Sequence, residues 1–498
     1  MGYKHGAYGE RTASKTKNAK QVNENVVYIG TAPINLVRGY DDADLINVPI
    51  KLRNLGEAQS KIGYSDSWDN FTICEAVDYH FNNTNGNVGP IYVINVLDPD
   101  IHRKGTAATK TVAFTNGTGS FVSDTVILDT IAIEDKTEGV DYEVEYDFNT
   151  SSVVIKSLIE NDPLTGNVTV TYYDVDLASV TESTIIGQHT AAGTYTGIQA
   201  VTLLYMKENA VPNILAAPGW SEKPAVYRAL CSAAQKINGH WDAFVNADIP
   251  LTYTTESGGS TITVKVETIA QAIAWKAANG YTSPISKVAW PQAKNGTKHY
   301  HLSTIMTATM LKVDLEHDSI PFESCSNKDI MATDQYFGDS ENQGFDQTEA
   351  NDLNEKGITT LCFWDGTFKL WGPHTAGYTY NGSMDASAIF ETNMRMLMFI
   401  TNGFQLRNGV KIDAPMTPND KDSIVISEQA ELDALVGIGA LIGHPEVLFL
   451  ETENTTADMI NGDFVWHILA TPTPPLKSAT AKVTYTDEGF ASFFGEED

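Results

Sequence analysis

Residues 25–33, NVVYIGTAP, form the apolar run from which the fold can be worked out. The run is rich in β-branched residues and ends at a proline, which is typical of a buried strand followed by a turn. Apolar residues recur every four positions over 70–82, so we predict a helix there, and PIYVINV at 90–96 predicts a second buried strand. A strand, a helix and a strand in this order predict a parallel sheet covered by helices.

The pattern of the sequence changes between residues 101 and 182. Runs such as TVILDTIAI at 125–133 and DYEVEYDF at 141–148 are short and alternating, and Gly, Asn, Asp and Pro separate them. A two-residue period with such punctuation is typical of antiparallel hairpins with one solvated face. We therefore predict an all-β module inserted into the α/β domain.

The α/β order then returns. VPNILAAPGW at 211–220 predicts a strand that leads into a loop. A helix is predicted to follow, with Ser221 as its cap and Gly239 as its stop. Further along, Asp365 and Gly366 stand between two apolar runs, which predicts a tight hairpin.

The last part of the chain predicts two long helices followed by strands, a pattern that suggests an α+β domain. The first helix carries an apolar stripe with alternating four- and three-residue spacing, and we expect this stripe in the core of the C-terminal domain. The stripe consists of Phe390, Met394, Leu397, Thr401 and Phe404. The second helix is predicted over about 427–441, and strand-like runs follow at 447–454, 463–472 and 478–486.

The two ends of the chain differ from the rest in composition. The first twenty residues hold five basic residues and one acidic residue, and the last twelve hold five acidic residues. Solvated, frayed termini are one interpretation. Arms that link one subunit to another are the alternative, since opposite charges at the two ends attract each other. The residues that favour arms are Tyr3, Tyr8, Arg11, Phe490, Phe493 and Phe494.

Together these patterns predict an α/β and α+β multidomain fold: an α/β core with an inserted all-β module, a C-terminal α+β domain and extended N- and C-terminal arms. A length of 498 residues is enough for two or three hydrophobic cores. The predicted divisions are 1–22 for the N-terminal linking arm, 23–100 and 183–372 for the α/β core, 101–182 for the all-β module, 373–485 for the C-terminal domain and 486–498 for the C-terminal linking arm.

Composition excludes several classes of partner. The formal net charge of -30 would repel a phosphate backbone, so no nucleic acid is expected. The longest uninterrupted apolar stretch, 434–443, is far shorter than a membrane span, so no membrane insertion is expected. Four cysteines without a C-x-x-C pair, and no signal peptide, fit a protein made in a reducing cytoplasm.

No catalytic motif is found. The sequence has no G-x-x-x-x-G-K-[ST] phosphate loop and no G-x-S-x-G elbow, and Ser221 is better explained as a helix cap. His299 and His301 could share one face of a strand, but no third ligand is in register, so no metal is predicted. We therefore predict no enzyme activity and no cofactor, and a structural building block instead.

Several segments, in order along the chain, resemble the contractile tail sheath family. The corner WGPHT at 371–375 is similar to the family's W-G-x-R-T, with His374 in place of the usual Arg. The β insert resembles a module of sheaths from Gram-positive phages and related particles. The other matching segments are GAYGE at 6–10, VYIGTAP at 27–33, ILAAPGW at 214–220, DIP at 248–250, GAL at 439–441, NTTADMING at 454–462 and ATP at 470–472.

The resemblance implies a protein that stacks as hexameric rings in a helical sheath and contracts to drive a tail tube through a bacterial envelope. Its partners would be further copies of itself, the tube protein, and the baseplate and tail terminator proteins. The arms would exchange strands between neighbours, the C-terminal domain would lie near the tube, and the insert would lie outside. The particle would be a virion tail or a phage-tail-like bacteriocin, assembled in the cytoplasm of the bacterial host.

Two other classes stay open at this point. A surface-layer or adhesin-type protein would suit the acidity and the β insert, but it would need an export signal. An α/β hydrolase would suit the core, but it would need the missing nucleophile elbow.

Overall fold

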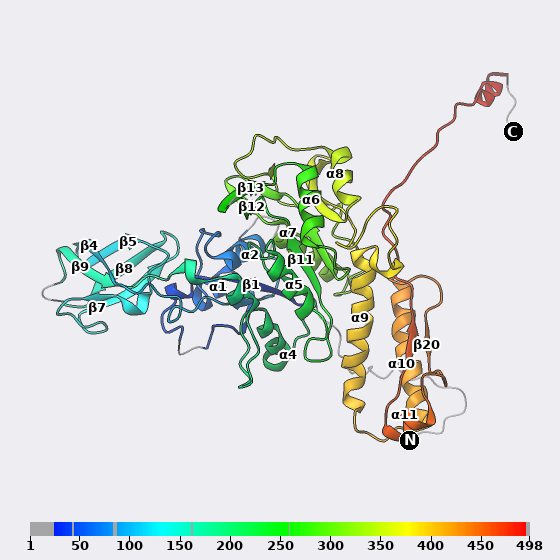
Figure 1. The fold of residues 1–498 in the computed structure, drawn as a ribbon, viewed down its shortest axis with the longest axis horizontal. Helices are drawn as coiled ribbons and strands as arrows, with labels where there is room; N and C mark the ends of the chain where they lie inside the picture. Colours follow the sequence, from blue (N-terminus) through cyan, green and yellow to red (C-terminus); the bar gives the residue numbers. More distant parts are fainter. Residues whose placement is uncertain (1–23, 42–43, 83–86, 161–162, 258, 495–498) are drawn as a thin grey trace, which may run out of the picture.

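A central eight-stranded sheet forms the core of the protein in a computed structural model, which describes residues 24–41, 44–82, 87–160, 163–257 and 259–494 (Figure 1). Its six inner strands are parallel and its two edge strands are antiparallel. Across the sheet, the strands are β19 (Thr367–Trp371), β18 (Ile358–Trp364), β14 (Ser286–Ala289), β11 (Phe244–Asp248), β10 (Ile214–Ala216), β1 (Val26–Gly30), β3 (Ile91–Asn95) and β2 (Pro49–Leu52).

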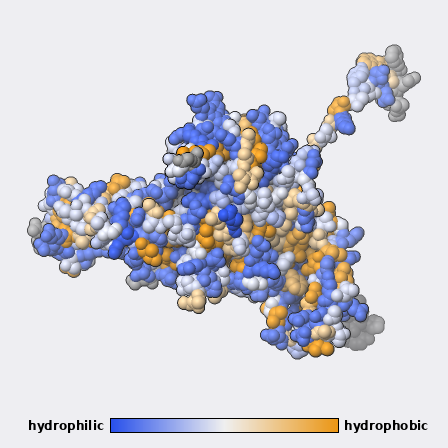
Figure 2. Space-filling view, viewed as in Figure 1, coloured by the Kyte–Doolittle hydropathy of each residue, from blue (hydrophilic) through white to orange (hydrophobic). Residues whose placement is uncertain are grey.

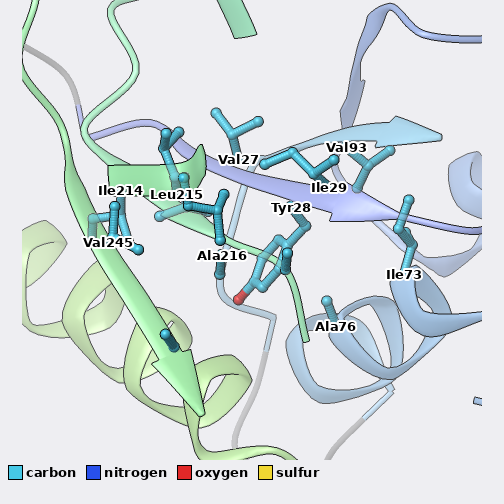
Figure 3. Packing of buried hydrophobic residues seen from close by; sticks show 14 of the residues in the cluster. Val27, Tyr28, Ile29, Ile73, Ala76, Val93, Ile214, Leu215, Ala216 and Val245 are labelled. Atoms are coloured by element: carbon cyan, nitrogen blue, oxygen red, sulfur yellow. The ribbon is translucent and has the colours of Figure 1, made fainter. Parts of the chain in front are cut away.

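The strand predicted from the opening run is β1, and it lies inside the sheet between β10 and β3. All of its residues are buried, because helices cover both faces of the sheet. On one face, α2 (Thr72–Phe81) and α7 (Leu302–Glu316) pack against each other, and the Tyr28 hydroxyl lies 2.8 Å from His80 Nε2 on α2. Figure 3 shows Tyr28 on the same side of β1 as Ala76 of α2.

The opposite face of the sheet is covered by α5 (Pro224–Ala233), where the Tyr227 hydroxyl lies 2.7 Å from the Ser286 hydroxyl of β14. This helix is shorter than predicted at both ends. Ser221 does not cap it, since its hydroxyl donates a hydrogen bond to Asp248, and Lys223 stands at the N-cap before Pro224. The helix ends before Gly239, so both predicted boundaries were wrong.

The antiparallel hairpins predicted in the insert form one six-stranded sheet with its own buried core, which projects from the rest of the molecule (Figure 1). Alternating burial along its strands reflects one packed face and one solvated face. The order across this sheet is β6 (Ala132–Ile133), β9 (Gly166–Tyr172), β4 (Ala108–Thr115), β5 (Thr118–Val122), β8 (Ser152–Ser157) and β7 (Tyr142–Asp147).

The predicted hairpin joins β18 to β19. Asp365 and Gly366 both have positive φ angles, +54° and +84°, as a two-residue turn between twisted strands requires. Glycine adopts this conformation at little cost, so the hairpin prediction is confirmed in its chemistry as well as its place.

The C-terminal part consists of two long helices beside a small two-stranded sheet (Figure 1). Its elements are α9 (Glu391–Asn408), α10 (Pro418–Gly437), β20 (Glu446–Leu448), α11 (Thr456–Asn461) and β21 (His467–Leu469). α10 begins about nine residues before the predicted start, because Thr417 accepts a hydrogen bond from the Asp420 amide and Pro418 occupies the first turn. The predicted class, multidomain α/β and α+β with several sheets, is confirmed.

The strand-like run at 478–486 is not a strand within the chain. Residues 474–487 have no helix or strand, and they extend away from the C-terminal helices to the short η7 (Glu488–Phe494) (Figure 1). Val483 is 93% exposed and Tyr485 is 79% exposed. The β-propensity of the run is therefore left without a partner strand among the described residues.

Shorter elements complete the fold. They are η1 (Ile34–Leu36), α1 (Leu55–Lys61), η2 (Leu128–Thr130), η3 (Leu177–Ser179), α3 (Glu182–Ile186), η4 (Gly197–Thr202), α4 (Leu203–Glu208), β12 (Thr252–Ser257), β13 (Ser260–Lys265), α6 (Ile269–Asn279), β15 (Gln292–Asn295), β16 (Lys298–Tyr300), β17 (Asp334–Tyr336), α8 (Gln347–Asn354), η5 (Ala386–Ala388) and η6 (Gly409–Lys411).

Deleting residues 103–176 and joining the ends with a short Gly/Ser linker should leave a folded protein. The Asp176 amide donates to the His102 carbonyl at 2.8 Å, so the two ends already lie together and a short linker can close the gap. A cooperative thermal melt checks this. Because Leu36 of the core packs into the module, Leu36→Gln should accompany the deletion to avoid a new apolar patch. Loss of the cooperative melt in the deletion variant, with and without Leu36→Gln, would show that the core depends on the module.

Candidate functional site: the junction at the start of helix α9

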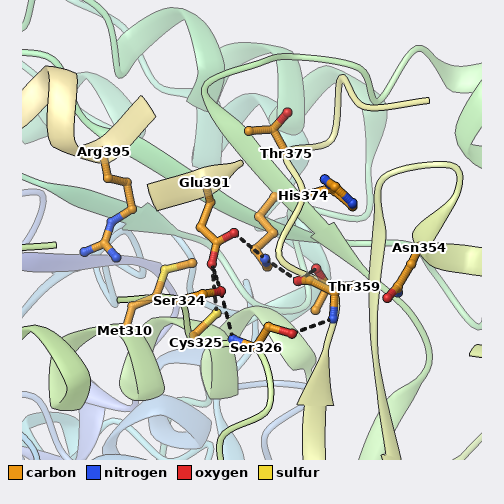
Figure 4. A network of polar contacts seen from close by, with 12 residues as sticks. Met310, Ser324, Cys325, Ser326, Asn354, Thr359, His374, Thr375, Glu391 and Arg395 are labelled. Atoms are coloured by element: carbon orange, nitrogen blue, oxygen red, sulfur yellow. Dashed lines mark hydrogen bonds and ion pairs between the residues drawn. The ribbon is translucent and has the colours of Figure 1, made fainter. Parts of the chain in front are cut away.

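After the chain leaves the central sheet at the end of β19, it reaches the start of α9, where a buried ion pair ties the helix to β14 (Figure 4). Lys287 Nζ on β14 lies 3.1 Å from Glu391 Oε2, and both side chains are fully buried. Lys287 also donates to the Gly372 carbonyl at 2.6 Å, and Ser324 donates to Glu391 Oε1. Glu391 is in the first turn of the helix, where a negative charge also interacts favourably with the helix dipole.

The corner at 371–375 supplies the other half of this junction. Gly372 has φ +128°, and a Cβ atom there would lie 2.8 Å from the side-chain nitrogen of Asn354. That nitrogen donates to the carbonyls of Ile358 and Trp371, both at 3.0 Å. The glycine is therefore needed both for its backbone conformation and for the space that the amide occupies.

His374, which stands where the resembled family is expected to have an Arg, is accommodated by aromatic stacking. Its ring lies 3.5 Å from that of Tyr378 and 5.0 Å from that of Phe390, measured between ring centroids. Nδ1 lies 3.1 Å from the Ile389 carbonyl, to which it can donate. Burial lowers the pKa of His374 to about 4, so the ring is neutral at pH 7 and adds no charge to the junction.

One turn into α9, Arg395 brings two carboxylates together. Its Nη2 lies 2.9 Å from Glu24 Oε1, just before β1, and the guanidinium also pairs with Asp314 near the end of α7. All three residues are buried. Burial and the neighbouring Asp314 raise the pKa of Glu24 to about 8, although Arg395 opposes this shift. The guanidinium of Arg395 thus links α9 to the start of β1 and to the end of α7, which are far apart in the sequence.

The predicted apolar stripe of α9 is not the buried face. Phe390 precedes the helix, and Phe390, Met394, Leu397 and Phe404 are all only partly buried, while Thr401 is exposed. The buried side chains include Met396 and Ile400, together with the polar Glu391 and Arg395. The stripe borders the core, with Met394 packed against it, whereas the charged Glu391 and Arg395 are buried; its role as the inner-domain helix stays a prediction. The signal that could have revealed the burial of Glu391 and Arg395 is their spacing of four residues, which puts them on one face.

The predicted arm residues fall into two groups. Tyr3, Tyr8 and Arg11 lie outside the described residues. Phe490 and Phe493 are 58% and 80% exposed on η7, to which Phe494 also belongs, and the rings of Phe490 and Phe493 stack on each other. Nothing in the described chain covers these two rings.

A hollow of about 780 Å³ lies at the carboxyl ends of the parallel strands, which is where α/β sheets bind ligands. His301 lies in it, with Nδ1 2.7 Å from Glu75. Burial alone would lower the pKa of His301, but Glu75 and two further carboxylates raise it to about 10, so it is no general base at pH 7. Among the described residues no hydrogen bond joins Ser221 to His301, so they do not form a hydrolase triad.

The two histidines considered for a metal point to different partners. His299 stacks on Tyr336, with ring centroids 3.6 Å apart, whereas His301 is held by Glu75. Within the described part of the chain, no group of three His, Cys, Asp or Glu side chains is placed to hold a metal ion. Nor is any helix in that part long and apolar enough to cross a membrane.

The fold is one found in contractile injection systems. A chain of the anti-feeding prophage baseplate, solved with six-fold symmetrisation, matches 98% of this chain and 100% of its own length, with a TM-score of 0.53 and 14% identity. The sheath complex of the extracellular contractile injection system PVC, in its contracted state, matches the same shares with a TM-score of 0.51 and 11% identity.

Sequence comparison identifies the relatives more narrowly. The tail sheath protein of Burkholderia phage BcepMu is 27% identical over 508 residues, covering 98% of this chain and 97% of that protein. The major tail sheath protein of Serratia phage KSP20 is 24% identical over 64% of this chain, and the tail sheath protein of Escherichia phage P2 is 25% identical over 63%. The aligned regions span 75% of the KSP20 protein and 73% of the P2 protein. No protein-family model matches the chain.

These relationships confirm the predicted resemblance to contractile tail sheath proteins, and with it a structural role in a contractile sheath. The relatives named here do not support a surface-layer protein or an adhesin. The assignment of the insert to particles of Gram-positive hosts stays a prediction.

Glu391→Gln should lower the free energy of unfolding by about 3–5 kcal/mol, because it leaves the Lys287 ammonium buried without its counter-charge. Chemical denaturation measures this. The control is Glu145→Gln, which removes an exposed ion pair with Lys156 and should change stability little. Equal effects of the two substitutions would show that the junction pair is no stronger than a surface pair.

Met396→Asp should destabilise the protein by several kcal/mol, because Met396 is fully buried and the new carboxylate would have no partner. Leu397→Asp, on the adjacent and partly exposed face, should have a much smaller effect. Thermal melts of the two variants compare the faces directly. A larger loss of stability for Leu397→Asp than for Met396→Asp would show that the predicted stripe is the core face of the helix.

Proposed function

We propose that this chain polymerises as a six-fold helical sheath around a tail tube and contracts to drive the tube through a bacterial envelope. Its partners are other copies of itself, the tube protein, and the baseplate and tail terminator proteins. It acts as a structural protein without catalysis, in a virion tail or tail-like particle assembled in the host cytoplasm. The near full-length match to the BcepMu tail sheath protein supports this reading.

The observation that carries the proposal is the unpaired run at 478–486. Its composition is typical of a strand, yet Val483 and Tyr485 are almost fully exposed in the single chain. A strand-like segment that extends from its own domain suits pairing with a neighbouring subunit, since an added strand contributes main-chain hydrogen bonds that need no large side chains. The extended segment starts near residue 474, before the predicted arm boundary at 486.

The small sheet of β20 and β21 offers an acceptor for such a strand. Two strands alone are marginal, and a third would stabilise them. The edge of β20 is partly occupied, because Gln429 of α10 accepts from the Val447 amide and donates to the Pro445 carbonyl. Among the described residues no strand pairs with the outer edge of β21, so we propose that the incoming arm pairs there.

We further propose that the C-terminal unit lies near the tube and the β module on the outside. Figure 2 shows apolar side chains gathered on the surface of the C-terminal helices. Exposed apolar groups of this kind favour contact with a partner. They include Val410, Ile412, Ile426 and Ile460. The module projects on the opposite side of the core, which suits an outer position (Figure 1).

Val483→Pro should abolish or strongly reduce tube formation while leaving the melt of the monomer unchanged. Proline removes a backbone donor from the linking strand, and each lost hydrogen bond is worth about 0.5–1.5 kcal/mol at every link of the lattice. Folding should survive because the side chain is exposed. Electron microscopy beside a thermal melt separates the two effects.

Val483→Ala is the matched control, because it shortens the side chain but keeps the backbone donor, and it should assemble. Normal tubes from the proline variant would contradict the linking role of this run. Failure of both variants would instead indicate that the side chain itself makes the contact.

A further inference from the structure

The N-terminal segment joins the described chain at a group of charges that do not balance. Two carboxylates, Glu24 and Asp314, share the single guanidinium of Arg395, and each of the three residues is at most 6% exposed. With both carboxylates ionised, this group would hold one net negative charge away from water, which is costly. Holding one proton on the pair of carboxylates removes that charge, as in other like-charged pairs.

The groups around this site do not supply the missing positive charge. On β14, Lys287 is already paired with Glu391 at 3.1 Å. Cys325 is a neutral thiol, since burial raises its pKa to about 12. Burial raises the pKa of Asp314, and His317, just after α7, acts against this shift, but its ring is bonded to the carboxylate of Glu323. A proton shared by Glu24 and Asp314 is therefore the species that neutralises the net negative charge of this group.

We propose that Glu24, Asp314 and Arg395 form a proton-dependent latch, which fixes where the N-terminal segment leaves the core and lets it go when the shared proton is lost. In this latch Arg395 is the positioning residue. The inference rests on the proposed role of residues 1–22 as a linking arm, whose root the latch would hold against α9.

The direction of the pH dependence follows from linkage. Burial and Asp314 raise the pKa of Glu24 from its ordinary 4.5 to about 8 while the latch is closed, and release returns it toward the ordinary value. The closed state therefore binds one more proton than the open state between these two values. The closed state is most favoured near pH 4.5 and becomes less favoured as pH rises. The equilibrium constant for opening increases by up to about tenfold per pH unit until about pH 8.

Limited trypsin digestion of the full-length monomer tests the latch. Cleavage after Lys20 requires the residues that follow it, as far as Glu24, to enter the protease, so it should need an open latch. Cleavage after Arg11, farther from the latch, serves as a reference within the same molecule and cancels the pH dependence of trypsin itself. We expect the ratio of Lys20 to Arg11 cleavage, measured by mass spectrometry, to rise by about tenfold or more between pH 6 and pH 8.

Glu24→Gln keeps the shape of the side chain but cannot lose a proton, so its cleavage ratio should stay low and nearly constant over this range. Asp314→Asn removes the other carboxylate and should flatten the profile too, which keeps the test open if one variant folds poorly. Glu134→Gln, on the exposed face of the β module, should behave like the parent.

A flat ratio in the parent, or a parent-like rise in both latch variants, would overturn the proposal. The readout uses monomers, so it is independent of tube formation. A working latch in a protein that forms no tubes would count against the proposed function alone. Tubes from a protein with a flat ratio would count against the latch alone.

Discussion

The buried pair of Lys287 and Glu391 is the interaction on which the junction between the sheet and the C-terminal helices depends. A fully buried ion pair need not stabilise the fold more than two apolar side chains of the same shape would, because the cost of desolvating the charges offsets much of their attraction. What it adds is position: Lys287 can be satisfied only if Glu391 and the Gly372 carbonyl both reach it. The start of α9 and the corner before it are therefore placed together, and at that corner Gly372 also leaves room for the amide of Asn354.

Sequence patterns predicted the sheet well because its strands are apolar on both faces and separated by helices. The same approach missed the junction, because it assumes that charged side chains are solvated. Glu24 and Arg395 are 371 positions apart, so no local period relates them. Conversely, the run at 478–486 has strand propensity but forms no strand, since a strand needs a partner that propensity does not supply.

The first described residue and the last described strand both adjoin the C-terminal helices. Glu24 is held by Arg395 on α9, and the last strand, β21, stands beside α10 through its pairing with β20. A displacement of α9 would thus act on the root of one terminal segment, while the sheet that adjoins the other segment lies in the same unit.

As the proposed link between subunits, the exposed segment at 474–487 would combine a strong attachment with freedom of direction. Its side chains make little contact with their own domain, so the direction of the segment can change without loss of buried apolar area. The strength of the link would come from backbone hydrogen bonds in the neighbour's sheet, which move with that neighbour as a rigid body. Subunits joined in this way could change their relative angle while each link keeps its bonds. A lattice with two arrangements then needs no second fold of the subunit, because the change is confined to segments that hold no core.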